Sequence, residues 1–336
     1  MITRITQLSL VLLMILGSVV VQSVFVETMF GGSVVASVAE SAKDMLAAGR
    51  IDDAITELNG RLSSTPKDAE SSNLLCRAYF ELEDWDRAEP SCKKATSLDP
   101  DNGRFHLWLG RVYGEKADHA NFMIAASLAG KVRGEFERAV LLNPSDVDAR
   151  LDLAEFYVEA PGVIGGGEQR ARDEARSIAT VNPAREHWVY ARIAEKKKDF
   201  TTAEREYHQY IELSKGDAEA WLNLALFLRR QERLDEMDEA IVKLSGAPML
   251  APDVLVEGAQ TLYRAGRRYS FATELLQRYL ATGPVEAAPA FKAHYLLGML
   301  LEKRGDKAGA AQEYRASLAL ARDFGIAQQA LNRVAH

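Results

Sequence analysis

Residues 67–100 read KDAESSNLLCRAYFELEDWDRAEPSCKKATSLDP. The stretch predicts two helices joined by a turn at Glu83–Asp84. The apolar or small positions of the first helix are Leu75, Cys76 and Tyr79, and those of the second are Trp85, Ala88, Cys92 and Ala95. A small residue in mid-helix, an aromatic residue one turn later and a closing proline at Pro100 are typical of a helix–turn–helix repeat.

The same spacing recurs along the chain. A weaker first unit occupies residues 40–68, and a third unit begins at Gly103 and ends at Pro144. Five further units follow, so the pattern predicts about eight helix pairs over residues 40–322. A last amphipathic segment, Ile326–Val334, predicts a capping helix within residues 323–336, because the end of a repeat array needs a cover for its apolar face.

This repeat pattern resembles that of tetratricopeptide (TPR) proteins, most clearly where units end in "LDP" or "LNP". The resemblance implies an all-α fold, a right-handed superhelical solenoid of TPR-like helix pairs with a concave groove. The physical reason is that no unit buries its apolar face alone, so neighbouring pairs stack. Small residues let the two helices of a pair approach closely.

Residues 1–39 differ from the rest of the chain. Arg4 is the only charged residue before Glu27, and residues 8–26 form an uncharged apolar run. Small residues follow at Val34–Ala36 and Ser37–Ala39, which fits the cleavage pattern of an export signal. An uncleaved membrane anchor is the alternative, because the run is long enough to span a bilayer. Either interpretation predicts an exported protein, periplasmic or anchored in the inner membrane with its repeats in the periplasm.

Composition and motifs argue against several classes of function. The net charge of −7 disfavours a nucleic-acid binder, which needs a basic face to neutralise phosphates. The sequence has no HExxH or GxSxG motif, and Gly165–Gly167 lack the Lys-Ser/Thr that follows the glycines of a phosphate-binding loop. His106, His187 and His294 occupy one register and predict packing between repeats. We therefore expect no catalytic residues, no metal and no cofactor.

The two cysteines, Cys76 and Cys92, belong to the same repeat. Counted from the turn, they fall nearly level on facing antiparallel helices. In an exported protein this placement favours a disulfide. The alternative is a pair of small buried hydrophobic side chains.

The TPR resemblance implies that the first helix of each repeat lines the groove. Carrying that register over predicts a partner-binding set that consists of Arg77, Arg111, Trp188, Arg192, Lys196, Leu222, Leu226 and Arg229. We expect Trp188, Leu222 and Leu226 to be exposed and flanked by the basic residues, a combination that suits an acidic-hydrophobic peptide. The alternative is that Trp188 packs against a neighbouring helix.

Two insertions interrupt the repeat length, near residues 118–131 and 159–167. Both fall between the helices of a pair in consecutive repeats, so we expect them to be neighbours along one edge. The residues of this insertion edge are Phe122, Met123, Pro161, Gly162, Gly165, Gly166 and Gly167. Loops on a regular scaffold often carry function. A tolerated edge or a lengthened second helix is the alternative.

The PG-x-x-GG loop in the second insertion is similar to that of the TPR-type partner proteins of TRAP solute transporters. This resemblance implies a ligand-accessible cavity. Two functions therefore remain open: a non-catalytic scaffold that binds a protein or peptide in its groove, and a small-ligand or transport-accessory protein.

Overall fold

The computed structural model describes residues 42–335, and the predicted leader over residues 1–39 lies outside them. Within the described part, the secondary structure is helical apart from one isolated bridge between Val285 and Ala288. After a short helical stretch at 42–47, the helices are α2 (Ile51–Ser64), α3 (Ala69–Glu81), α4 (Trp85–Leu98), α5 (Gly103–Asp118), α6 (Phe122–Leu142), α7 (Val147–Glu159), η1 (Gly162–Ile164), α8 (Glu168–Ala179), α9 (Pro183–Lys196), α10 (Phe200–Leu213), α11 (Ala218–Arg230), α12 (Leu234–Gly246), α13 (Val254–Ala265), α14 (Tyr269–Thr282), α15 (Ala290–Lys303), α16 (Lys307–Leu320) and α17 (Gly325–Val334). None of these helices combines the length and the apolar composition that crossing a bilayer requires.

Short polar side chains set the starts of many helices. Asp68 and Asp84 accept hydrogen bonds from the backbone N–H groups of Ser71 and Arg87, which have no partner within their own helix. The predicted turn at 83–84 is correct, since α3 ends at Glu81 and α4 begins at Trp85. Glu83 adopts a left-handed backbone conformation there, with φ of 59°.

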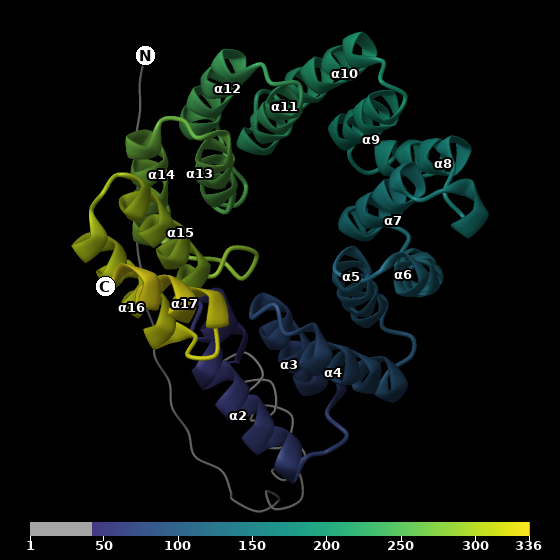
Figure 1. The fold of residues 1–336 in the computed structure, drawn as a ribbon. Helices are drawn as coiled ribbons and strands as arrows, with labels where there is room; N and C mark the ends of the chain where they lie inside the picture. The colour runs from purple at the N-terminus through teal and green to yellow at the C-terminus, as the bar shows by residue number, and fades with distance from the viewer. Residues whose placement is uncertain (1–41, 336) are drawn as a thin grey trace, which may run out of the picture. The chain divides into compact units, whose positions relative to one another are not determined.

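The helices pack as antiparallel pairs, and consecutive pairs stack into a superhelical array, as predicted. The first helix of a pair contacts the first helix of the next pair, as α3 does with α5 and α7 with α9. In Figure 1 these first helices line the inner side of the array and the second helices lie outside them. The inner wall is therefore built from α3, α5, α7, α9, α11, α13 and α15.

The three histidines that share a register each contact a glutamate of their own helix pair. The Nδ1 atom of His106 lies 2.6 Å from the Glu135 carboxylate, on the second helix of its own pair. His187 and His294 make the same contact, at 2.7 Å, with Glu206 and Glu313. The feature that recurs is a contact between a histidine on the first helix of a pair and a glutamate on the second helix. His106 also meets the preceding repeat, because its Nε2 lies 3.0 Å from the carbonyl oxygen of Pro100. Packing between repeats stays a prediction for His187 and His294.

The first insertion is a longer second helix. Helix α6 has 21 residues, whereas α4 has 14, and the added turns begin at Phe122. The second insertion forms the short 3₁₀ turn η1 between α7 and α8. The η1 turn contacts α6 just beyond the first insertion, because the Arg133 guanidinium lies 3.3 Å from the Ile164 carbonyl oxygen and donates to it.

The last helix does not simply cover an open end. Phe324, just before α17, packs edge-to-face on Phe291 and Tyr295. Phe291 and Phe324 belong to the same buried cluster as the core residues of the first repeats. The backbone N–H of Arg322 donates to Asp52 on α2, at 3.0 Å. The two ends of the array are thus in contact.

Candidate functional site

The inner wall of the second to fourth repeats contains a hollow of about 870 Å³. We call it the acidic hollow. Its residues come from α3, α5, α6, α7 and the loop before α15, and are Arg77, Phe80, Glu81, Trp108, Arg111, Gly114, Glu115, Asp118, Val132, Phe136, Asp152, Glu155, Phe156, Glu159, Glu286 and Ala287. The hollow therefore combines an apolar and aromatic floor with many carboxylates.

Trp108 is the centre of the aromatic floor. The guanidinium carbons of Arg77 and Arg111 lie 5.2 Å and 5.0 Å from its ring centroid, within the range of cation–π attraction. Phe80 packs edge-to-face on the same indole at 5.4 Å. These contacts fix two of the predicted groove residues, Arg77 and Arg111, on the wall of the hollow.

Ion pairs neutralise part of the acidic lining. Arg111 donates to Asp152 at 2.7 Å, and Lys292 donates to Glu81 at 3.0 Å. Arg77 forms a bidentate ion pair with Glu286, which lies in the loop between α14 and α15. The C-terminal part of the chain thus supplies groups that hold the α3 side of the hollow.

Two carboxylates of the hollow have no partner in the described part of the chain. Neither Glu115 nor Asp118 makes a side-chain hydrogen bond or an ion pair there. Burial, and then the negative charge of Asp118, raise the pKa of Glu115 above its ordinary value. Burial also raises the pKa of Glu81 and of Asp152, against the effect of their cationic partners. Glu115 and Asp118 are thus the carboxylates of the hollow that lack an ion-pair partner in that part of the chain.

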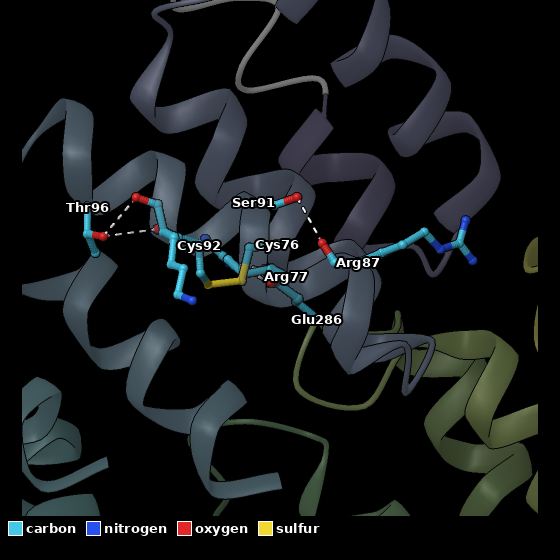
Figure 2. Close-up of a disulfide and its surroundings, with 8 residues drawn as sticks. Cys76, Arg77, Arg87, Ser91, Cys92, Thr96 and Glu286 are labelled. Carbon is cyan, nitrogen blue, oxygen red and sulfur yellow. Dashed lines mark hydrogen bonds and ion pairs between the residues drawn. A yellow bond between two sulfur atoms is a disulfide. The ribbon is translucent and has the colours of Figure 1, made fainter. Parts of the chain in front are cut away.

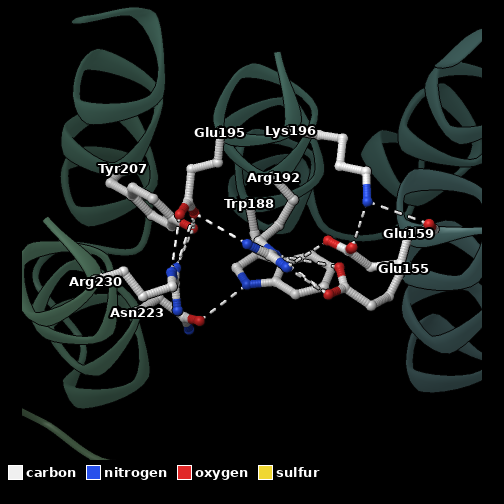
Figure 3. Close-up of polar contacts among 9 residues, drawn as sticks. All are labelled: Glu155, Glu159, Trp188, Arg192, Glu195, Lys196, Tyr207, Asn223 and Arg230. Atoms are coloured by element: carbon white, nitrogen blue, oxygen red, sulfur yellow. Dashed lines mark hydrogen bonds and ion pairs between the residues drawn. The ribbon is translucent and has the colours of Figure 1, made fainter. Parts of the chain in front are cut away.

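The predicted central cluster is held by internal partners (Figure 3). Trp188 is half-buried, and its indole N–H donates to the Asn223 side chain at 2.9 Å. Arg192 donates to Glu155 at 2.7 Å and Lys196 donates to Glu159 at 2.7 Å. Of the two alternatives for Trp188, packing against the neighbouring helix is the one the structure shows.

The predicted exposure of Leu222 is wrong, since only 7% of it is accessible. Leu226 is partly buried and packs on the same core cluster. Arg229 differs from the other basic residues of the set because no carboxylate pairs with it among residues 42–335, and its Nε is buried without an acceptor. Burial and the nearby Arg264 and Arg230 lower its pKa.

The predicted insertion edge divides into an apolar tip and a tight turn. Phe122 and Met123, at the start of α6, are 86% and 81% exposed. Pro161 and Gly162 are also exposed, whereas Gly165 packs against Arg133 of α6. A side chain at Gly166 would collide with the Ala160 carbonyl, and Gly167 has a φ of 154° that favours glycine. These glycines are needed for the turn itself.

Cys76 and Cys92 form a disulfide between α3 and α4, with their Cα atoms 5.1 Å apart (Figure 2). Arg77, which binds Glu286, is the next residue after Cys76. The disulfide therefore lies behind the wall of the acidic hollow and ties together the helix pair that forms it.

Sequence reasoning did not find Trp108, Phe156, Glu115 or Asp118. The register that places Arg111 in the groove also places Leu107 there, one turn earlier, but Leu107 is buried and its neighbour Trp108 lines the hollow. The sequence does contain a signal that could have located Glu115. Arg77 and Arg111 are 34 residues apart, and Glu81 and Glu115 repeat that spacing. No group of three or more His, Cys, Asp or Glu side chains suited to a metal ion occurs within residues 42–335.

The comparisons with known proteins bear on the fold. The yeast Tom70 structure aligns with 84% of this chain at 15% identity and a TM-score of 0.50, and the chain spans 58% of that protein. A tetratricopeptide repeat protein from Parabacteroides merdae aligns with 90% of this chain and 98% of its own, at 13% identity and a TM-score of 0.45. TTC0263, a TPR protein of Thermus thermophilus, aligns with 57% of this chain and 98% of its own, at 17% identity and a TM-score of 0.46. No curated protein matches the sequence.

A family model supplies the assignment. The tetratricopeptide repeat model matches residues 40–102, 73–129, 190–236 and 257–324, which together make up more than half of the chain. The resemblance of the 159–167 loop to TRAP-transporter partner proteins has no support among these matches and stays a prediction. The stacked helix pairs and the matched residues together show that this chain belongs to the tetratricopeptide repeat family.

Proposed function

We propose that the chain is a non-catalytic interaction scaffold that binds a segment of a partner protein on the inner wall of its second to fourth repeats. The acidic hollow is the observation that carries this function. It offers a partner about 870 Å³ of space, an aromatic floor around Trp108 and two carboxylates without internal partners. Buried aromatic anchors surrounded by polar groups are typical of the energetic centre of an interface.

Rigidity of the wall supports the same function. The second repeat is tied by the Cys76–Cys92 disulfide, and Arg77 is held by Glu286. A wall that is already ordered loses little conformational entropy when a partner binds. The scaffold thus presents its aromatic floor in a fixed position.

We place this scaffold outside the cytoplasm, either free in the periplasm or held at the inner membrane by residues 8–26. The apolar leader of the sequence and the disulfide support this location, since disulfides persist in oxidising compartments. Thiol labelling of protein taken from the native host, under denaturing and non-reducing conditions, tests it. We expect no labelled thiols before reduction and two afterwards. Two free thiols at once would contradict the proposed location.

Crosslinking in the native host, followed by mass spectrometry, tests the binding function. We expect crosslinked partner peptides to map to the hollow and to be lost in the Trp108→Ala variant. Leu213→Ala, which also removes a large and partly exposed side chain but on α10, is the matched control and should keep the partner. The melting temperature of both variants shows whether each is folded. A folded Trp108→Ala variant that retains the partner would contradict the proposal.

A small-ligand or transport-accessory function is the second candidate. The volume of the hollow supports it, because small-molecule sites typically enclose about 300–1,000 Å³. The inserted loop 159–167 lies beside the hollow, which includes Glu159. Isothermal titration of small hydrophobic acids against the wild-type chain and against a variant lacking residues 160–167 tests this function. Heat of binding that the deletion abolishes would favour it over the scaffold.

A further inference from the structure

The balance of charge in the acidic hollow identifies the chemistry of the partner. Seven carboxylates line it, namely Glu81, Glu115, Asp118, Asp152, Glu155, Glu159 and Glu286, against the two guanidinium groups of Arg77 and Arg111. Lys292, Arg192 and Lys196 reach the lining from neighbouring elements and pair with Glu81, Glu155 and Glu159. When all these ion pairs are formed, Glu115 and Asp118 are the two carboxylates of the hollow that remain without an ion-pair partner among the described residues.

Glu115 and Asp118 lie three residues apart on α5, at the edge of the aromatic floor. Residues with this spacing are neighbours on a helix surface, and like charges there repel. His119 and Lys292 lie near enough to Glu115 to favour its charged form, but neither forms an ion pair with Glu115 or Asp118 among residues 42–335, whereas the other five carboxylates of the hollow are paired. The empty position is therefore suited to a cation from outside.

The aromatic floor is suited to the same kind of group. Trp108 already attracts the guanidinium groups of Arg77 and Arg111, which shows that a cation fits against this surface. Phe156 also lines the hollow and has no cation over its ring in the described part of the chain. A long basic side chain can lay its methylene groups on such a floor and carry its charge to the carboxylates.

We infer that the acidic hollow binds a segment of a partner protein in which Lys or Arg residues stand next to an apolar or aromatic residue. This inference rests on the proposed scaffold function and names the partner's chemistry. Charge complementarity carries it, since an acidic segment would meet Glu115 and Asp118 with like charge. The acidic-hydrophobic partner expected for the central cluster is disfavoured, because Glu155 and Glu159 already pair with Arg192 and Lys196.

Three short synthetic peptides test the inference on the full-length chain. One alternates Lys with Phe, the second has Glu in place of each Lys, and the third has Gln there. Fluorescence anisotropy of labelled peptides at low and high salt gives the affinities. We expect the Lys peptide to bind at least about tenfold more tightly than the other two, and its advantage to shrink as salt screens the charges.

A matched pair of variants locates the effect. Glu115→Gln/Asp118→Asn should weaken the Lys peptide about tenfold and leave the Gln peptide unchanged. Glu239→Gln/Glu274→Gln removes the same charge from exposed positions on α12 and α14, and it should change the affinity for neither the Lys peptide nor the Gln peptide. Glu115→Lys/Asp118→Lys should reverse the preference, so that the Glu peptide binds best.

The inference is overturned if none of the peptides binds, if the Glu or Gln peptide binds as tightly as the Lys peptide, or if both double amide variants behave alike. These outcomes are distinct from failure of the scaffold function. If the Trp108→Ala variant loses the crosslinked partner but the wild-type chain shows no preference for the Lys peptide, the proposed binding function stands and the basic partner is rejected.

Discussion

At the scale of single residues, Gly110 marks the closest approach within the third helix pair. A Cβ atom added to Gly110 would lie 2.5 Å from ring carbons of Phe136, which is itself buried. Gly298 stands in the same relation to Tyr314 in the last pair, also at 2.5 Å. In both pairs the small residue of the repeat pattern makes room for the aromatic side chain of the second helix.

Gly110→Ala is therefore expected to lower the free energy of unfolding by about 1–3 kcal/mol, because the added methyl group overpacks the core. Urea unfolding followed by circular dichroism measures the change. Gly134→Ala is the control, since nothing lies within 4 Å of a Cβ there. That control should be neutral or stabilising by up to about 1 kcal/mol through helix propensity. Equal effects of the two substitutions would contradict the steric explanation.

Arg229 and Arg230 are adjacent in sequence and have opposite environments. Arg230 donates to Glu195 through two hydrogen bonds of 2.8 Å. Arg229 has no carboxylate partner among the described residues, its Nε is buried without an acceptor, and its pKa is lowered by burial and by Arg264. We therefore expect Arg229→Met to raise the free energy of unfolding by up to about 1 kcal/mol. Arg230→Met should lower it by a similar amount, because Glu195 loses two of its hydrogen bonds and keeps those from Tyr207 and Arg192.

Thermal unfolding of both variants at neutral pH provides the test. The two melting temperatures should move in opposite directions relative to the wild type. A drop in both would mean that Arg229 contributes a favourable interaction, and the environment assigned to it here would be wrong.

The residue pattern predicted which side chains are buried better than it predicted which are exposed. Small and aromatic residues such as Cys76, Gly110 and Tyr113 fill the positions expected of them, because the contact inside a pair recurs in every repeat. Leu222 was wrongly predicted to be exposed, and Trp108 was not found. Exposure on the inner wall depends on the angle at which neighbouring first helices pack, and the spacing of residues does not encode that angle.

At the scale of elements, α17 substitutes for the first helix of a further repeat. In the fifth pair, Glu195 accepts hydrogen bonds from Tyr207 of its own pair and from Arg230 of the next first helix. In the last pair, Glu302 likewise accepts from Tyr314, and Arg333 of α17 takes the place of the arginine from a following repeat. The cap therefore reproduces both the apolar and the polar contacts of a repeat.

The attachment of α17 should weaken in acid. The hydrogen bonds from Arg333 hold the pKa of Glu302 below its ordinary value. The stabilisation is therefore complete at neutral pH and is lost as the pH falls through the folded-state pKa of Glu302. Because both side chains are partly exposed, Arg333→Ala should lower the free energy of unfolding at pH 7 by no more than about 1 kcal/mol.

Hydrogen exchange of α17 amides across pH checks this expectation, after correction for the intrinsic pH dependence of exchange. The wild type should lose protection in α17 at acid pH, whereas Arg333→Ala should show reduced protection already at pH 7 and less further change. Arg315→Ala, which removes a guanidinium without a described partner from α16, is the control. An unchanged pH profile in Arg333→Ala would contradict the role of this pair.

Several elements were predictable from the sequence because their signals are local. The turn at 83–84, the helix pairs and the final helix all depend on contacts between residues near in sequence. The first insertion was less clear, since an apolar segment such as Phe122–Leu128 suits either a loop or a helix. The structure adds it to α6, where Asn121 caps the helix by accepting from the N–H of Ile124.

At the scale of the described molecule, the ends of the array meet, and this contact builds part of the acidic hollow. Lys292 at the start of α15 binds Glu81 at the end of α3, and Glu286 binds Arg77. The sequence offered no sign of this closure, because it depends on the summed twist of all the pairs. The hollow was therefore not predictable as a unit, although its first helices were.

Lys292→Met should reveal how much the closure contributes. Glu81 is almost fully buried, and Lys292 is its ion-pair partner, so the substitution leaves a buried carboxylate with only the more distant charge of Arg77 to offset its own. We expect the free energy of unfolding to fall by about 2–3 kcal/mol at pH 7. Because burial already raises the pKa of Glu81, protonation should relieve the penalty, and the difference from wild type should shrink as the pH falls.

Lys303→Met, which removes an exposed lysine from the other end of α15, is the control and should change stability little. Glu81→Gln in the Lys292→Met background should recover most of the loss of stability, because the amide carries no charge.

Hydrogen exchange of the Lys292→Met variant then distinguishes a local loss of the contact between the ends of the array from a general loss of stability. The amides of α3 and α15 should lose protection first, while those of α9 and α10, in the middle of the array, keep theirs. Uniform loss along the array would show that the contact between the ends is not an independent source of stability.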